Sequence, residues 1–464
     1  MHKILHLDLK GAPMKIPFFE EVIKSPVKWG CTGVLIEWED TFPYTGELAE
    51  IGSNGSSCGD NMYTREEAKY IIKCSYDLGY DAIQLIQTIG HMEFVLKHPK
   101  FKRLREERKS PSVLCPSRPE SLSLVKEMLR QAMDLQPDAR YIHIGADEVW
   151  HTAVCDECKK RAMSNEHGVP SIFLEHIREI VTFIKKYSQV PVTVLMWDDM
   201  LRNINVETLK HYKIGDLVQP VIWNYNVKEH FHFSPQMWTS YEQIFTFVWA
   251  GSAYKGANGS CKMASPIARY ASNQEAWMHL IKNNKYKVSF YGMVFTGWSR
   301  YDHYATMCEL MPVAFPCLAT CMNYWTAIYK QNDDNIVIID DLPIIEWPGM
   351  YLAEMIMHRL ANLKDQSNNL IHGDMVATWL NPWQLEHSFT SPVQVECIKN
   401  TAETLINHFK EIQRPLIAHL NLITGKRSVA EWMGTNFTPT VNGLEKILEA
   451  ASNRIKAGAS VKPK

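Results

Sequence analysis

Features that mark several protein classes are missing from this chain of 464 residues. No stretch approaches the ~20 uninterrupted apolar residues that a membrane-spanning helix needs. The formal charge of -2 shows no excess of basic residues that could bind the phosphates of a nucleic acid. The densest basic run, residues 97–109, also contains Glu106 and Glu107. We therefore expect no membrane partner and no nucleic-acid partner.

A secretion signal and a disulfide framework are also missing. Residues 3–9 already have the pattern of a strand, which leaves no room for a charged segment, an apolar core and a cleavage site. The eleven cysteines are odd in number and scattered from Cys31 to Cys397, which is typical of reduced thiols. These features predict a cytoplasmic protein.

One CxxC pair is present, Cys155 and Cys158, and no second pair accompanies it. A structural zinc site usually needs four ligands, so a single pair is weak support for zinc. We favour packing as the role of these two cysteines. The sequence thus predicts no metal and no cofactor.

Eight short β-rich runs recur, separated by segments long enough for a helix, which is the pattern of βα units around a parallel sheet. Eight such units within the first ~300 residues predict an α/β fold, a (β/α)8 TIM barrel. The runs lie at residues 4–8, 33–38, 82–87, 141–147, 192–197, 220–225, 245–249 and 291–298.

The character of the chain changes after about residue 330. Prolines there separate helix-like segments, at residues 349–363, 392–408 and 444–457. We predict a catalytic barrel over residues 1–330 and a helical C-terminal region over residues 331–464. That region could cap the barrel or form a homodimer contact, and the sequence does not decide between these roles.

Two adjacent acids, Asp147 and Glu148, follow the fourth predicted strand. Alternation along a strand would place His143, Gly145 and Asp147 on one side, with Glu148 where the strand gives way to a loop. An isolated pair of this kind is most simply explained by the N-terminus of a helix. Polar and aromatic residues also end the other predicted strands, however, and barrel enzymes keep their active sites there. We therefore interpret both acids as catalytic, in two different environments.

Residues 143–148, His-Ile-Gly-Ala-Asp-Glu, match the H-x-G-x-D-E motif of glycoside hydrolase family 20, the β-N-acetylhexosaminidases. The chain resembles this family also at residues 87–91, 196–199, 223 and 296–298. More narrowly, it resembles the hexosaminidase D branch at residues 6–13, 35–40, 90–98 and 297–304. That branch implies a nucleocytoplasmic enzyme, so we expect a nuclear location as well.

The resemblance implies a retaining exo-enzyme that removes terminal β-linked N-acetylhexosamine from glycans or glycoconjugates. In this family the substrate's 2-acetamido group attacks in place of a protein nucleophile. Glu148 would protonate the glycosidic oxygen and then activate water. Asp147 would orient the acetamide and stabilise an oxazolinium intermediate.

The resemblance also implies a set of sugar-binding residues. Trp197, Trp223 and Trp298 would wall the pocket, and their apolar surfaces would help to keep Glu148 protonated, because burial raises the pKa of a carboxyl group. His91 matches a family histidine, and Asp8 would bind a substrate hydroxyl. Either Tyr225 or Tyr254 would bind the acetamide carbonyl, and we prefer Tyr225.

One position departs from the family pattern. Many members have glutamate two residues after the last-strand tryptophan, where it binds the outer hydroxyls of the sugar, whereas this chain has Arg300, with Asp302 beyond it. Recognition of O4 and O6 is therefore open. Because the hexosaminidase D branch tends toward galactosaminides, we expect N-acetylgalactosamine to be preferred over N-acetylglucosamine.

Two other classes of function remain as alternatives. A metal-dependent barrel hydrolase could use ligands at the strand ends, namely His6, Asp8, His91, His143, Asp147 and Asp198. No H-x-H pair follows the first strand, which disfavours it. A non-catalytic sugar-binding barrel is the other alternative, and it would have no need for the two intact acids.

Overall fold

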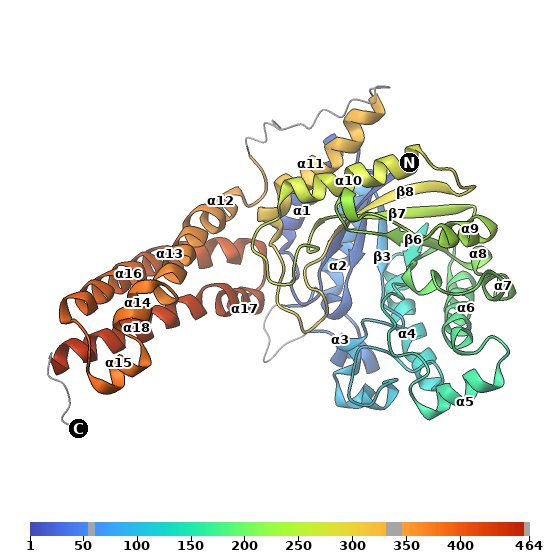
Figure 1. The fold of residues 1–464 in the computed structure, drawn as a ribbon. Helices are drawn as coiled ribbons and strands as arrows, with labels where there is room; N and C mark the ends of the chain where they lie inside the picture. The colour runs from blue at the N-terminus through green and yellow to red at the C-terminus, as the bar shows by residue number, and fades with distance from the viewer. Residues whose placement is uncertain (54–60, 331–345, 459–464) are drawn as a thin grey trace. The chain divides into compact units, whose positions relative to one another are not determined.

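Eight parallel strands close into a barrel in the computed structural model, which describes residues 1–53, 61–330 and 346–458 (Figure 1). Each strand pairs with the next along the chain, and β8 pairs with β1. The predicted (β/α)8 fold class is confirmed. The strands are β1 (His2–Asp8), β2 (Gly33–Glu37), β3 (Asp81–Leu85), β4 (Tyr141–His143), β5 (Thr193–Trp197), β6 (Gln219–Trp223), β7 (Phe247–Lys255) and β8 (Ser289–Gly297).

The barrel interior is filled by apolar side chains from the strands. Residues such as Ile4, Leu35 and Val221 are inaccessible to solvent, and Trp197 and Trp249 belong to the same cluster. Trp223 and Trp298 are only partly buried and pack against this cluster from its edge. The barrel is therefore a packed core whose aromatic edge faces the carboxyl ends of the strands.

Helices surround the strands, and local sequence accounts for where several of them begin. Thr64 and Glu67 form a reciprocal capping box at the start of α2, as their spacing predicts. Proline occupies the first turn of α4 and α6, where its missing N–H has no cost. The helices up to the eighth strand are α1 (Ile16–Lys24), α2 (Arg65–Asp77), α3 (Glu93–Leu96), α4 (Pro119–Leu135), α5 (Asp156–Ser164), α6 (Val169–Tyr187), α7 (Val206–His211), α8 (Ile214–Leu217), α9 (Pro235–Ile244) and α10 (Ile267–Lys282).

Two strands differ most from their predicted extents, β4 and β7. β4 ends at His143, so the predicted strand over residues 141–147 is too long. Backbone φ is positive at Gly145, Ala146 and Glu148 (62°, 66° and 51°). Strand alternation therefore does not extend to Asp147, and both acids lie on a loop. β7 is longer than predicted, because it continues to Lys255.

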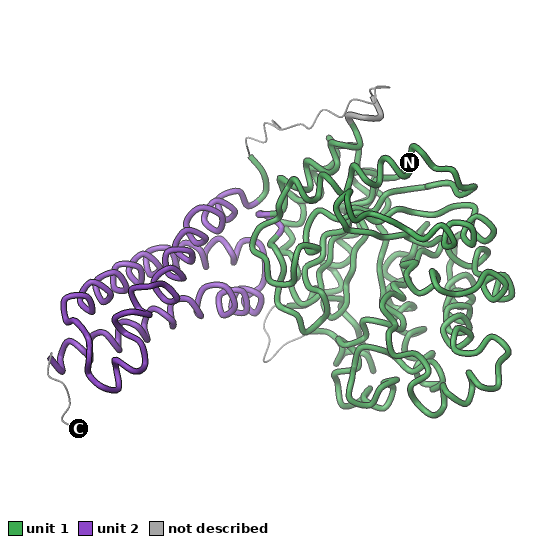
Figure 2. The backbone as a smooth tube through the Cα atoms, viewed as in Figure 1, with its two compact units in different colours: residues 1–310, 314–348 green, residues 311–313, 349–464 purple. Residues whose placement is uncertain are grey.

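The chain forms two compact units, one of residues 1–310 and 314–348 and the other of residues 311–313 and 349–464 (Figure 2). The predicted boundary after residue 330 adjoins residues 331–345, which lie outside the described residues. No helix of the described residues is both long and apolar enough to cross a membrane. The remaining helices are α11 (Met311–Lys330), α12 (Met350–Glu354), α13 (Ala361–Ile371), α14 (Asp374–Trp379), α15 (Pro382–His387), α16 (Pro392–Ile423), α17 (Lys426–Asn436) and α18 (Thr438–Ala457), with a π-helical segment, Met355–Leu360, between α12 and α13.

Candidate active site

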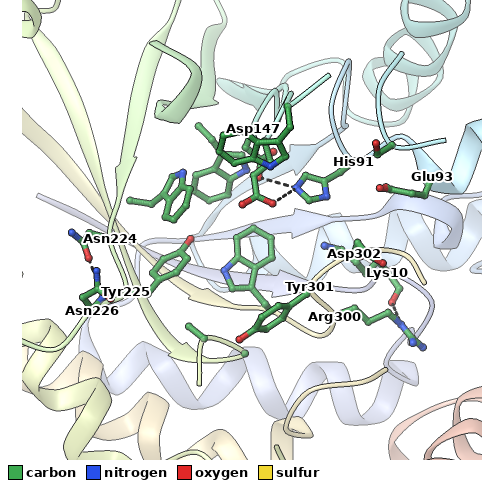
Figure 3. Close-up of a pocket in the computed structure, with 18 of the residues that line it drawn as sticks. Lys10, His91, Glu93, Asp147, Asn224, Tyr225, Asn226, Arg300, Tyr301 and Asp302 are labelled. Atoms are coloured by element: carbon green, nitrogen blue, oxygen red, sulfur yellow. Dashed lines mark hydrogen bonds and ion pairs between the residues drawn. The ribbon is translucent and has the colours of Figure 1, made fainter. Parts of the chain in front are cut away.

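A pocket of about 830 Å³ opens at the carboxyl ends of the strands, in the first unit (Figure 3). Its wall contains both adjacent acids and most of the aromatic residues predicted for the site. Its lining residues include Lys10, His91, Glu93, Ser112, Asp147, Glu148, Trp150, His151, Trp197, Arg202, Trp223, Asn224, Tyr225, Trp298, Arg300, Tyr301 and Asp302.

His91 joins the two acids. Its Nε2 lies 3.5 Å from Oδ2 of Asp147 and 3.2 Å from Oε2 of Glu148. Gln87 donates from Nε2 to the other oxygen of Asp147 at 3.1 Å. Asp147 is buried, whereas the Glu148 side chain is 38% exposed. The predicted burial of Glu148 by apolar walls is therefore wrong for this structure, although the two acids do have different environments.

The charges of this trio support one another. Burial by itself lowers the pKa of His91, but the Asp147 carboxylate and hydrogen bonds to both acids raise that pKa well above its ordinary value. Burial raises the pKa of Asp147, yet the His91 charge and hydrogen bond bring it below the ordinary value. An imidazolium beside an ionised Asp147 is thus the favoured state of the pair.

Asp199 holds the backbone of Glu148. Its Oδ2 accepts the Glu148 N–H at 2.9 Å, and its Oδ1 accepts the indole N–H of Trp223 at 3.2 Å. Glu148 has a φ of 51°, a conformation that costs energy for a residue other than glycine. Burial and the nearby Asp147 charge raise the pKa of Asp199 to about 7. Asp199 is therefore a positioning residue, linking the loop after β4 to a pocket wall on β6.

We expect Asp199→Asn to lower kcat/KM by about 10- to 100-fold, because a buried donor left without its acceptor costs about 1–3 kcal/mol. An amide offers one acceptor where two N–H groups now point, so its NH2 group faces one of the donors. The fall should be mostly in kcat, because substrate contacts stay in place. Steady-state kinetics would measure kcat and KM of Asp199→Asn. The control is Asp216→Asn, because Asp216 is an exposed aspartate outside the pocket. An unchanged kcat would contradict the positioning role.

Aromatic rings from β5, β6 and β8 form the pocket walls. The rings of Trp197 and Trp298 lie 5.7 Å apart between centroids. Tyr225 stacks on Trp223 at 5.2 Å and meets the edge of Trp298 at 6.5 Å. Burial raises the pKa of Tyr225, which keeps its hydroxyl a hydrogen-bond donor. Flat apolar faces of this kind suit the C–H surfaces of a sugar ring.

A buried lysine, Lys10, lies on the side of the pocket away from Tyr225 (Figure 3). Lys10 Nζ lies 3.5 Å from Asp8, 3.4 Å from Glu37 and 3.8 Å from Glu39, and 5.0 Å from the centre of the Trp298 ring. Burial lowers the pKa of Lys10, but the three acids raise it well above its ordinary value. This cluster fixes the loops after β1 and β2.

Two predicted binding residues are not in the pocket wall. Asp8 is buried and accepts the backbone N–H groups of Ser299, at 2.7 Å, and Lys10, at 3.1 Å. Tyr254 is also buried, and its hydroxyl donates to the His6 carbonyl at 3.1 Å. Asp8 is thus placed to fix the loop after β8. Tyr225, the preferred tyrosine, is the one that lines the pocket.

Arg300 and Asp302 do line the pocket, but much of their hydrogen bonding is with the backbone. The Arg300 guanidinium donates to the carbonyl oxygens of Lys10, Gly11 and Ala305 at 3.2, 3.1 and 2.7 Å. Oδ1 of Asp302 accepts the N–H groups of Tyr304 and Ala305, at 2.7 and 2.9 Å. Arg300 therefore shapes the loop after β8 as well as lining the pocket.

Several lining residues were not predicted as site residues. Glu93 is one, and burial raises its pKa to about 7; it belongs to the polar group that follows the third strand. Trp150 is 71% exposed at the rim and stands two residues after Glu148. Trp150 could have been predicted as a site residue from its closeness to the Asp-Glu motif. Glu93 and Lys10 could have been predicted from their positions after the ends of strands.

The ligand set of the rival metal enzyme is not assembled. His6 pairs with Glu37 at 3.0 Å. Asp198 forms two bonds with Arg202, at 2.6 and 2.7 Å, and burial lowers the pKa of His143 to about 3. Over the described ranges, none of the six proposed ligands belongs to a group of His, Cys, Asp and Glu residues close enough to share an ion.

Comparisons with known proteins show the family of this chain. The sequence model of the glycosyl hydrolase family 20 catalytic domain matches residues 37–325. Hexosaminidase D of Homo sapiens is 31% identical over 465 residues, covering 97% of this chain and 94% of that protein. Hexosaminidase D of Bos taurus is 35% identical over 322 residues, covering 69% and 90%. A crystal structure of a β-N-acetylhexosaminidase from Bacteroides fragilis is 13% identical, with a TM-score of 0.49, and covers 71% of this chain and 69% of that one.

Proposed function

Because this chain belongs to glycosyl hydrolase family 20, we propose that it is a retaining exo-β-N-acetylhexosaminidase whose substrate supplies the nucleophile. One observation carries the mechanism: a single nitrogen of His91 lies within 3.5 Å of both acids. Asp147 and Glu148 are neighbours on the loop after β4, and both contact His91. This pairing supports a role for Asp147 in holding the acetamido group, which in this family takes the place of a carboxylate nucleophile.

In the first step, Glu148 gives its proton to the glycosidic oxygen as the bond to C1 breaks. The acetamide carbonyl oxygen forms a new bond to C1, which yields an oxazolinium ion and releases the aglycone as an alcohol. In the second step, Glu148 takes a proton from water while the water oxygen attacks C1 and the acetamide reforms. The sugar leaves with its β configuration retained, and Glu148 is protonated again.

Asp147 and Tyr225 hold the acetamide during these steps. The Asp147 carboxylate, kept ionised by His91, accepts the acetamide N–H and stabilises the positive charge that develops on that nitrogen. The Tyr225 hydroxyl donates to the carbonyl oxygen and aims it at C1. Trp197, Trp223 and Trp298 enclose the methyl group and the ring.

We further propose that the outer hydroxyls of the sugar meet Glu93, Lys10 and Asp302, which lie across the pocket from Tyr225 (Figure 3). Glu93 Oε2 is buried and accepts no hydrogen bond within the described residues, so it can bind a hydroxyl without losing a partner. These groups take over the role of the glutamate that Arg300 replaces. The preference is for N-acetylgalactosamine.

Side-by-side kinetics on aryl N-acetyl-β-galactosaminide and aryl N-acetyl-β-glucosaminide test this function. We expect turnover of both β-substrates, with a higher kcat/KM for the galacto epimer, and none of the α-anomers. Equal or reversed kcat/KM values would overturn the epimer preference alone. Absence of turnover between pH 4 and pH 8, with sugar still bound, would instead make the barrel a binding protein.

A further inference from the structure

Three cysteines and one glutamate meet beside the active-site loops. Sγ of Cys115 lies 3.5 Å from Sγ of Cys155 and 3.6 Å from Sγ of Cys158, and Sγ of Cys158 lies 3.2 Å from Oε2 of Glu106. The four ligand atoms are all within 4.8 Å of one another. Cys115 is 40 residues away from Cys155 in sequence, so the CxxC pair has a third thiol that its local pattern does not reveal.

The spacing of these atoms is that of a tetrahedral zinc site. Zinc binds thiolate sulfur at about 2.3 Å, so two sulfur ligands at a tetrahedral angle lie about 3.8 Å apart. The observed sulfur distances of 3.5 and 3.6 Å need only a small expansion to accept the ion. Three soft thiolates and one carboxylate complete four ligands, a set that suits zinc better than the hard cations magnesium or calcium.

The ligands are held in place before any ion arrives. Glu106 Oε1 accepts the N–H groups of Val154 and Cys155, at 2.7 and 3.1 Å, which turns Oε2 toward the sulfurs. The Cys158 N–H points to Sγ of Cys155 at 3.4 Å, at the start of α5, which fixes the position of that sulfur. Glu106 and Cys115 stand on two paired segments, joined by the bridge between Arg105 and Leu114.

We propose that Glu106, Cys115, Cys155 and Cys158 bind one structural zinc ion. Three thiolates and a carboxylate bring four negative charges to the ion's two positive ones. Glu106 and Cys155 lie in the wall of a surface cavity that is also lined by five basic residues, Lys102, Arg103, Arg105, Arg108 and Arg118, and by three further acids, Glu107, Asp156 and Glu157. The cavity offers a path for the ion, and its basic residues, which outnumber these three acids, offset part of the excess negative charge.

The zinc joins the two segments that carry one side of the active-site pocket. Cys155 follows Trp150 and His151, and Cys115 follows Ser112, and all three of these neighbours line the pocket. The Ser112 carbonyl also accepts the N–H of Met92, next to His91, at 3.0 Å. The ion therefore closes the loop after β4 onto the segment between β3 and α4, close to the residues that position both acids.

Metal content of the purified full-length protein tests the proposal. We expect one zinc per chain after purification without chelator, and less than about 0.1 per chain in Cys155→Ser. The matched control is Cys74→Ser, because Cys74 is also a half-buried free cysteine but lies outside the cluster; it should keep one zinc. Cobalt exchanged into the wild type should give the near-ultraviolet thiolate absorption of a tetrahedral site, and Cys155→Ser should lack it.

Removing the ion should also loosen the fold locally. We expect the Tm of Cys155→Ser to fall by more than about 5 °C relative to Cys74→Ser, because binding free energy is lost from the folded state. Wild-type protein without zinc, with all three thiols reduced, would overturn the proposal and leave them as small apolar groups in the cluster with Ala162 and Ile172. A disulfide within the trio, found by non-reducing mass spectrometry, would also overturn it. None of these measurements depends on the glycosidase activity.

Discussion

We expect Glu148→Gln to lower kcat/KM by about 100- to 10,000-fold on substrates whose leaving group needs protonation, the range that general acid–base catalysis contributes. Glutamine keeps the shape of the side chain but can neither give a proton to the glycosidic oxygen nor take one from water. His91 is 3.2 Å from Glu148 and could not take over this role, because its raised pKa makes it a weak acid.

The dependence on the leaving group identifies which step has failed. With an alkyl or sugar aglycone, Glu148→Gln should show the full loss; with a strongly acidic phenol the first step needs little protonation, so the loss should shrink. Initial rates over a series of aryl leaving groups, with Glu66→Gln as the control on an exposed glutamate of α2, measure this. A loss of the same size for every leaving group would rule Glu148 out as the general acid.

The fold was accessible from the sequence because each strand of the barrel is short, apolar and bounded by helix-forming segments. β2 and β5, for example, coincide with their predicted runs to within a residue at each end. The conformation of the segment after β4 could not be predicted from local sequence in this way. Gly145 and Ala146 turn into left-handed conformations, and Gln87 accepts the Ala146 N–H at 3.2 Å. That turn depends on a partner 59 residues away, which no local periodicity can report.

The candidate site shows the same division between local and long-range information. Motif positions found His91, Trp223 and Tyr225, because the ends of parallel strands meet at one edge of the barrel. Tyr254, the less preferred tyrosine, lies on β7, which continues to Lys255, and its hydroxyl donates to the His6 carbonyl. The contact of Cys115 with the CxxC pair also depends on how two loops fold together.

Removing the acetamido group from the substrate should be as damaging as removing an active-site residue. Aryl glycosides with a 2-hydroxyl group should lose more than about 1,000-fold in kcat/KM, because a positioned intramolecular nucleophile is worth effective molarities of about 10⁵–10⁸ M. Neither a metal-dependent hydrolase nor an enzyme with a carboxylate nucleophile has this requirement. Comparable rates for 2-acetamido and 2-hydroxy substrates would therefore overturn substrate assistance while leaving the family membership intact.

Asp147→Asn should fail at the same chemical step, with kcat about 100- to 1,000-fold lower, as expected when a charged group that stabilises the transition state is removed. The asparagine still bonds the acetamide but no longer balances the positive charge on its nitrogen, and it releases the His91 imidazolium from its ionised partner.

A thiazoline analogue of the oxazolinium ion should inhibit the wild type and bind much more weakly to Asp147→Asn. Asp216→Asn, exposed and distant in sequence, should match the wild type in both assays. Equal thiazoline inhibition of Asp147→Asn and wild type would mean that this carboxylate does not recognise the charged intermediate, and the acetamide would then need another partner among the residues that line the pocket.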